Sequence, residues 1–139
     1  DRVTPELARG LAERRVWLIV HCNHPRELAP DVDAALERLA DAGVPLLDQT
    51  VLLRGANDDP DVLAELFDAL VRRRVRPYYL HHPDAVQGNA HFRVSRETGW
   101  RIVDETRERI GGIAMPRYVV DPPSGEGKRD VSPPGEDAV

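Results

Sequence analysis

The 139-residue chain has a single cysteine, Cys22, and few aromatic side chains. One cysteine excludes an internal disulfide and any metal site built from several cysteines of this chain. No apolar run approaches the roughly 20 residues of a membrane-spanning helix, and no signal peptide is recognisable. The net charge of −5 argues against a general binder of nucleic acid or other polyanions. We therefore expect a cytoplasmic protein that binds neither nucleic acid nor membranes.

The composition is that of a globular domain, with 41% apolar and 31% charged residues. A chain of this length can form one modest domain with its own core. It begins with Asp1 rather than methionine, and a helical pattern starts almost at once. We therefore expect it to be part of a longer protein.

Strand-like and helix-like patterns alternate four times along the chain. The predicted strands are the apolar runs at residues 16–20, 46–53, 75–80 and 113–120. The predicted helices carry apolar residues at helical spacing, at residues 4–11, 32–40, 59–70 and 95–110. Such alternation with short connections is typical of α/β structure with parallel strands. It fits half of a (β/α)8 barrel or a small doubly wound sheet, and the pattern alone does not separate the two.

The composition changes after Asp121, where proline and glycine become frequent. Such segments bury too little apolar surface to form a packed core. We assign residues 1–128 to the folded unit and residues 129–139 to a loop or disordered tail.

Polar residues crowd the ends of the predicted strands. Residues 21–24 follow the first strand, residues 81–84 follow the third, Asp121 follows the fourth, and Gln49 interrupts the second. In parallel α/β folds, ligand and catalytic groups gather at the C-terminal ends of the strands. Three polar clusters at equivalent ends therefore predict a functional site.

Each of these residues also has a purely structural interpretation. His24 and the following proline can open a turn, and Asp84 and Asp121 can cap turns or helices. Lys128 can be a solvated lysine in a glycine-rich loop, which resembles a phosphate-binding loop only weakly. Gln49 is harder to explain in this way, because a buried amide needs partners for its oxygen and its nitrogen.

Five blocks of sequence, in the same order, resemble the lysine 2,3-aminomutase family. They are residues 21–28 (HCNHPREL), 42–58 (AGVP to GAND), 76–84 (RPYYLHHPD), 88–93 (which end in HFR) and 118–128 (YVVD to GEGK). The match runs from about residue 10 to residue 128 and is far more specific than any single motif.

The resemblance implies the C-terminal half of a radical S-adenosylmethionine-type partial (β/α) barrel with parallel strands, formed by residues 1–128. The family moves the α-amino group of lysine to the β-carbon, using a radical from S-adenosylmethionine, a [4Fe–4S] cluster and pyridoxal 5′-phosphate imine chemistry. Position by position, Lys128 matches the lysine that binds pyridoxal phosphate. His21 and Gln49 match positions near S-adenosylmethionine, and Asp84 and Asp121 match the two carboxylates that hold the substrate's distal ammonium.

Two carboxylates facing one ammonium favour lysine or a cationic analogue such as arginine, and they disfavour glutamate. The cluster requires a Cys-x3-Cys-x2-Cys motif, which this chain lacks. The resemblance therefore implies that the cluster ligands lie upstream and that this polypeptide alone is inactive. The sequence leaves open whether the longer protein assembles as a homo-oligomer.

Three alternatives remain at this point. One is a relative that forms β-lysine for the modification of a translation factor. Another is a non-catalytic binding fragment. The third, of a different class, is a metal-dependent barrel hydrolase, whose metal ligands would be His21, His24, His81, His82 and Asp84.

Overall fold

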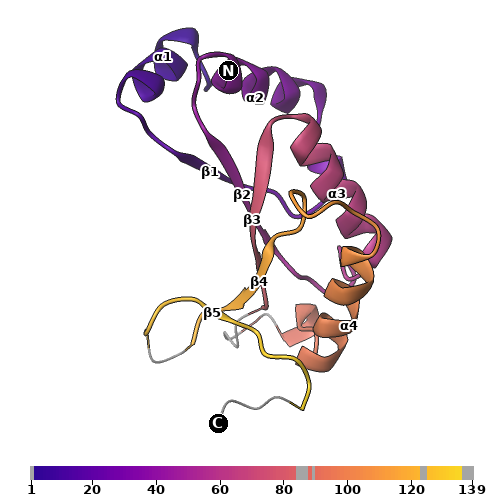
Figure 1. The fold of residues 1–139 in the computed structure, drawn as a ribbon. Helices are drawn as coiled ribbons and strands as arrows, with labels where there is room; N and C mark the ends of the chain where they lie inside the picture. The colour runs from indigo at the N-terminus through magenta and orange to yellow at the C-terminus, as the bar shows by residue number, and fades with distance from the viewer. Residues whose placement is uncertain (1, 84–87, 89, 123–124, 136–139) are drawn as a thin grey trace.

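The computed structural model describes residues 2–83, 88, 90–122 and 125–135. Within these ranges one sheet has the strand order β1-β2-β3-β4-β5 (Figure 1). The strands are β1 (Leu18–His21), β2 (Leu46–Val51), β3 (Val75–His81), β4 (Arg117–Val120) and β5 (Arg129–Asp130). The first four are parallel, and β5 is antiparallel to β4.

The helices follow the strands in alternation, as the sequence predicts. They are α1 (Pro5–Glu13), α2 (Pro30–Asp41), α3 (Pro60–Arg72) and α4 (Arg96–Arg107), with short 3-10 turns η1 (Pro25–Glu27) and η2 (Ala90–Phe92). Side chains of Thr4, Asp59 and Ser95 accept N–H groups of the first turns of α1, α3 and α4. No helix in the described ranges is long and apolar enough to cross a membrane.

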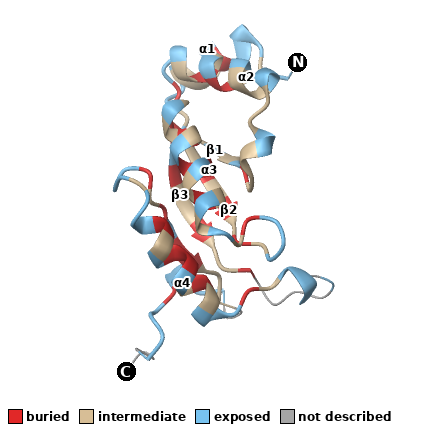
Figure 2. Ribbon diagram, turned by 90° about the vertical axis from the view of Figure 1, so that its right-hand side faces the viewer, coloured by how far each residue is buried: buried red, intermediate tan, exposed pale blue. Residues whose placement is uncertain are grey.

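Helices α2, α3 and α4 cover one face of the sheet (Figure 1, Figure 2). Burial alternates along β2: Leu46, Asp48 and Thr50 are buried towards the helices, whereas Gln49 and Val51 on the other face are partly exposed. We call this other face the inner face. A doubly wound sheet carries helices on both faces. Because the helices here cover one face, the fold is a partial β/α barrel rather than a doubly wound sheet.

The open inner face exposes apolar side chains of β1 and of the residue before it. An apolar run in a parallel sheet is expected to be buried on both sides, but Trp17 is 66% exposed and Ile19 is 45% exposed. Residues 16 and 17 also precede the strand, because the Val16 N–H donates to the Leu11 carbonyl and ends α1 instead.

The fourth strand is shorter than predicted, and the tail is partly ordered. Residues 112–114 form turns, with hydrogen bonds from the Ala114 N–H to Gly111 O and from the Met115 N–H to Gly112 O, and residues 115 and 116 precede β4. Pro116 lacks the N–H group that a strand position would donate. Arg129 and Asp130, which the sequence assigns to the tail, form β5, and Val131 packs into the core at 3% exposure.

Gly99 allows the closest approach of α4 to the sheet. A Cβ added there would overlap the Tyr118 hydroxyl oxygen and lie 3.4 Å from Leu52 Cδ2. The hydroxyl is 2.7 Å from His82 Nδ1, a hydrogen bond that limits its freedom to move. The small residue is therefore required by packing, although glycine disfavours a helix.

Replacing Gly99 with alanine should lower the free energy of unfolding by about 1–3 kcal/mol, because overpacking outweighs the gain in helix propensity. Gly10→Ala in α1 is the matched control, since its Cβ would meet only Arg14 Nη1, at 3.5 Å. That control should be more stable than the original protein by about 0.5–1 kcal/mol. Chemical unfolding of both variants measures the difference; equal effects would refute the packing argument.

Candidate functional site

One row of polar side chains crosses the inner face at the C-terminal ends of the strands. The sheet register aligns His21 with Gln49, and Gln49 with Tyr79. These pairs come from neighbouring parallel strands and belong to the same face. The structure therefore brings together the two residues that the sequence assigns to S-adenosylmethionine, His21 and Gln49.

A second group lies further along the same face. Asp121 follows β4, and its Oδ2 is 3.6 Å from His81 Nδ1, while its Oδ1 is 3.5 Å from Lys128 Nζ. The Lys128 Nζ is also 5.9 Å from the centre of the Tyr79 ring, which is within reach of a weak cation–π contact. The predicted Asp121 and Lys128 thus converge, whereas the predicted Asp84 lies outside the described residues.

The return of the chain from β4 to β5 brings Lys128 back to the sheet. Val120 and Arg129 pair in the antiparallel ladder, so Lys128 stands beside the end of β4. Gly127 adopts a φ of 84°, a left-handed conformation that residues with a side chain rarely accept. Glu126 is exposed and its carboxylate binds the Arg129 guanidinium. The negative charge of Glu126 is therefore neutralised by Arg129 rather than by Lys128.

Tyr79 and Arg117 are inner-face residues that the sequence analysis missed. Arg117 lies over the Tyr79 ring at 5.8 Å, and its Nε and Nη2 donate to the Asp130 carboxylate at 2.9–3.2 Å. Asp130 belongs to β5, so this pair holds in place the strand that directly follows Lys128. A register shift at Asp48/Gln49 sets Tyr79 rather than Tyr78 opposite Gln49, and no sequence pattern signals that irregularity.

A buried asparagine ties together the ends of β1 and β2. Asn57 is fully buried; its amide nitrogen donates to the carbonyls of Asn23 and Val51, both at 2.8 Å, and its oxygen accepts the Leu53 N–H at 2.7 Å. The Asn23 side chain in turn accepts the Val51 N–H at 2.8 Å. These bonds satisfy backbone groups where the strands end, and so they fix the loops that follow His21 and Gln49.

On the opposite face of β2, Asp48 forms a buried network. Its Oδ1 accepts the Cys22 N–H at 2.9 Å, and its Oδ2 is 2.8 Å from Thr50 Oγ1, which is also 2.8 Å from Cys22 O. One hydroxyl proton cannot serve both acceptors if Asp48 is charged. A protonated Asp48 donates to Thr50, which then donates to Cys22 O, and every group is satisfied. Burial, the largest cause, raises the pKa of Asp48 to about 7.

This buried acid predicts a specific pH dependence of stability. The folded-state pKa lies above the unfolded value of about 3.9, so the folded protein binds the proton more tightly. Stability should therefore fall as the pH rises from about 4 to about 7, by about 2–4 kcal/mol. Asp48→Asn, which keeps the hydrogen bonds of the protonated acid, should remove this loss. Chemical unfolding at several pH values measures it, and equal slopes for both proteins would contradict the assignment.

The cysteine and histidines give no support to a metal site. Burial, the largest cause, raises the pKa of the Cys22 thiol to about 11, so the metal-binding thiolate is disfavoured. His24 Nδ1 accepts the Arg26 N–H within a cap of η1, and His82 bonds to Tyr118 on the side of α4. Among the described residues, no group of three or more metal-binding side chains converges.

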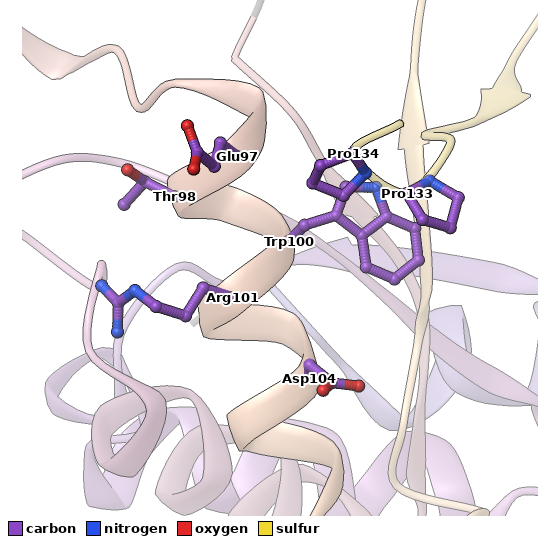
Figure 3. Close-up of a pocket in the computed structure, with 7 residues that line it drawn as sticks. All are labelled: Glu97, Thr98, Trp100, Arg101, Asp104, Pro133 and Pro134. Carbon is purple, nitrogen blue, oxygen red and sulfur yellow. The ribbon is translucent and has the colours of Figure 1, made fainter. Parts of the chain in front are cut away.

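An open pocket of about 730 Å³ lies elsewhere, against α4. Figure 3 shows the Trp100 ring beside Pro133 and Pro134; Glu97, Arg101 and Asp104, which also line the pocket, project from the same helix. None of the residues that line it belongs to the inner-face groups. We therefore place the candidate site at the strand ends and interpret this pocket as the seam where the C-terminal segment packs on α4.

Comparison with a solved structure defines the class of fold. The chain resembles the crystal structure of a radical SAM methyltransferase from Sphaerobacter thermophilus, with a TM-score of 0.56 and 23% sequence identity over 84% of this chain and 38% of that one. At this identity the likeness concerns the fold alone, which is the partial β/α barrel of radical SAM enzymes. No family model matches the chain.

Several curated relatives are similar to the chain along most of its length. The chain is 47% identical over 134 residues to the L-lysine 2,3-aminomutase of Fusobacterium nucleatum subsp. nucleatum and 46% identical to that of Clostridium subterminale; in each case the match covers 96% of this chain and 32% of the relative. It is 39% identical to the glutamate 2,3-aminomutase of Clostridioides difficile. These similarities confirm the predicted resemblance to the lysine 2,3-aminomutase family, and the chain spans about a third of the length of these relatives.

Proposed function

We propose that this chain is the substrate- and cofactor-binding part of an enzyme that moves the α-amino group of L-lysine to the β-carbon. The observation that carries the proposal is the meeting of a carboxylate and an amine, Asp121 and Lys128, at the strand ends of the inner face. The names of the most similar relatives, L-lysine 2,3-aminomutases, support the same reaction.

The residues present fit pyridoxal phosphate. Lys128 offers a primary amine from a hairpin that Arg117 and Asp130 fasten, so its position over the inner face is defined. Pyridoxal phosphate, when bound, supplies a carbonyl that takes up amino groups and stabilises a neighbouring unpaired electron. Lys128 would hold the cofactor, and a neutral amine at this position is the form that can react.

His21 and Gln49 offer hydrogen-bonding groups side by side, which fits the polar groups of S-adenosylmethionine. The chain does not fit an iron–sulfur cluster. Such clusters are held by several cysteine thiolates, and this chain has one cysteine, which is buried with a raised pKa. We assign the cluster to the part of the longer protein outside this chain, and no chemical step follows from these residues.

The charge of Asp121 supports lysine over glutamate as the substrate. An aspartate that accepts an ammonium would repel the side chain of a glutamate substrate. Asp84, assigned by the resemblance to the same role, would add a second negative charge. We therefore propose a substrate with a cationic side chain, lysine or a close analogue.

Chemical trapping tests the cofactor assignment. The full-length protein loaded with pyridoxal phosphate is reduced with borohydride, digested and analysed by mass spectrometry. The expected result is a cofactor mass on the peptide that contains Lys128. A label on another lysine, or the absence of a label, would reject Lys128 as the cofactor lysine.

A further inference from the structure

The Lys128 ammonium occupies the place at Asp121 where a ligand cation would bind. Lys128 Nζ is 3.5 Å from Asp121 Oδ1, and the two side chains are 34% and 41% exposed. A carboxylate in contact with one ammonium is already neutralised, so a second ammonium gains less from approaching it.

The other oxygen of Asp121 faces a different group. Its Oδ2 lies 3.6 Å from His81 Nδ1, and the His81 side chain is only 13% exposed. Oδ1 is therefore the oxygen of Asp121 that meets the Lys128 ammonium. The Tyr79 ring borders the Lys128 ammonium at 5.9 Å and helps to retain it there.

Neighbouring arginines are paired elsewhere. Arg117 binds Asp130, and Arg129 binds Glu126. In the described part of the chain, the ammonium that lies against Asp121 is therefore that of Lys128.

We propose that Lys128 is an internal competitor for the cation subsite at Asp121. While Lys128 carries an ammonium, it holds Asp121 and weakens the binding of a cationic side chain. Once Lys128 loses its charge, Asp121 becomes available to that side chain. This inference rests on the proposed function, which assigns Asp121 to the substrate's ammonium. It predicts an order in which Lys128 is neutralised first and the cationic substrate binds tightly afterwards.

The size of the effect follows from the exposure of the pair. Partly exposed ion pairs are weak, so Lys128 hinders the ligand without blocking it. Loss of the pair, together with relief of the repulsion between two ammonium groups, should tighten binding of a cation about three- to tenfold.

Calorimetric titration of the full-length protein, free of pyridoxal phosphate, tests the proposal with L-lysine as the probe. Lys128→Met should bind L-lysine about three- to tenfold more tightly than the original protein, whereas Lys128→Arg, which keeps the charge, should not. L-norleucine, which lacks the side-chain ammonium, should bind Lys128→Met and Lys128→Arg with equal affinity. Arg129→Met is the matched control, because it removes a positive charge one residue away that is paired with Glu126.

Two results with single variants would overturn the proposal. One is an affinity of Lys128→Met for L-lysine that equals or falls below that of the original protein. The other is an equal gain in the Arg129→Met control. Adding Asp121→Asn to Lys128→Met should abolish the gain, and a gain that persists would also contradict it. Borohydride trapping at Lys128 does not depend on this competition, so failure of the proposed function is recognised separately.

Discussion

Lys128→Ala should abolish β-lysine formation by the full-length protein, with a loss of rate on the order of 10³-fold or more. The variant lacks the amine that we propose to hold pyridoxal phosphate at the strand ends of the inner face. It should also lose the borohydride-dependent cofactor label on this peptide. Product formation from L-lysine, followed by chromatography or NMR, measures the first effect, and mass spectrometry measures the second.

Arg129→Ala serves as the control for this experiment. Arg129 lies in the same hairpin, and its exposed side chain pairs with Glu126 rather than with Asp121. The activity of Arg129→Ala should stay within a few fold of the activity of the original protein. The role of Lys128 would be refuted if Lys128→Ala retained activity comparable to that of this control.

Asp121→Asn should raise the dissociation constant for L-lysine about ten- to a hundredfold, which corresponds to about 1–3 kcal/mol. The substitution keeps the size of the side chain and removes the charge that faces the ammonium. Titration of the cofactor-loaded protein with L-lysine measures the change, and L-norleucine should be affected much less.

Glu126→Gln provides a carboxylate-to-amide control from the same loop. Its side chain is exposed and binds Arg129, so the dissociation constant for L-lysine should change little. An unchanged affinity in Asp121→Asn would reject Asp121 as a cation-binding residue. A similar loss in both variants would indicate a general effect of charge rather than a specific contact.

Much of the fold follows from local signals in the sequence. The cap at Thr4 with Pro5 marks the start of α1, and Asp59 and Ser95 mark two other helices in the same way. The alternation of these helices with apolar runs is enough to predict parallel α/β structure. Such signals depend on neighbouring residues, and for that reason they can be recognised in a single sequence.

Features that depend on distant contacts were not predictable. Trp17 and Ile19 belong to an apolar run that is typical of a buried strand, and only the position of the helices shows that one face stays open. The short pairing of β5 with β4 brings together residues about ten positions apart without a hydrophobic pattern.

The candidate site was predicted in outline. The rule that functional groups gather at the strand ends indicates His21, Gln49 and Asp121, and the structure places the first two in one row. Tyr79 was missed because a register shift moves it opposite Gln49. Asp48 stands next to Gln49 in the sequence but lies on the opposite face, buried in a network that only the structure reveals.

The central claim is that the protein acts on a cationic amino acid and shifts its amino group. The most direct test supplies L-lysine and L-glutamate in equal amounts to the full-length protein, purified without oxygen and given reductant, S-adenosylmethionine and pyridoxal phosphate. NMR of the products should show β-lysine, with little or no β-glutamate. Formation of β-glutamate in preference to β-lysine, or of neither product, would contradict the account.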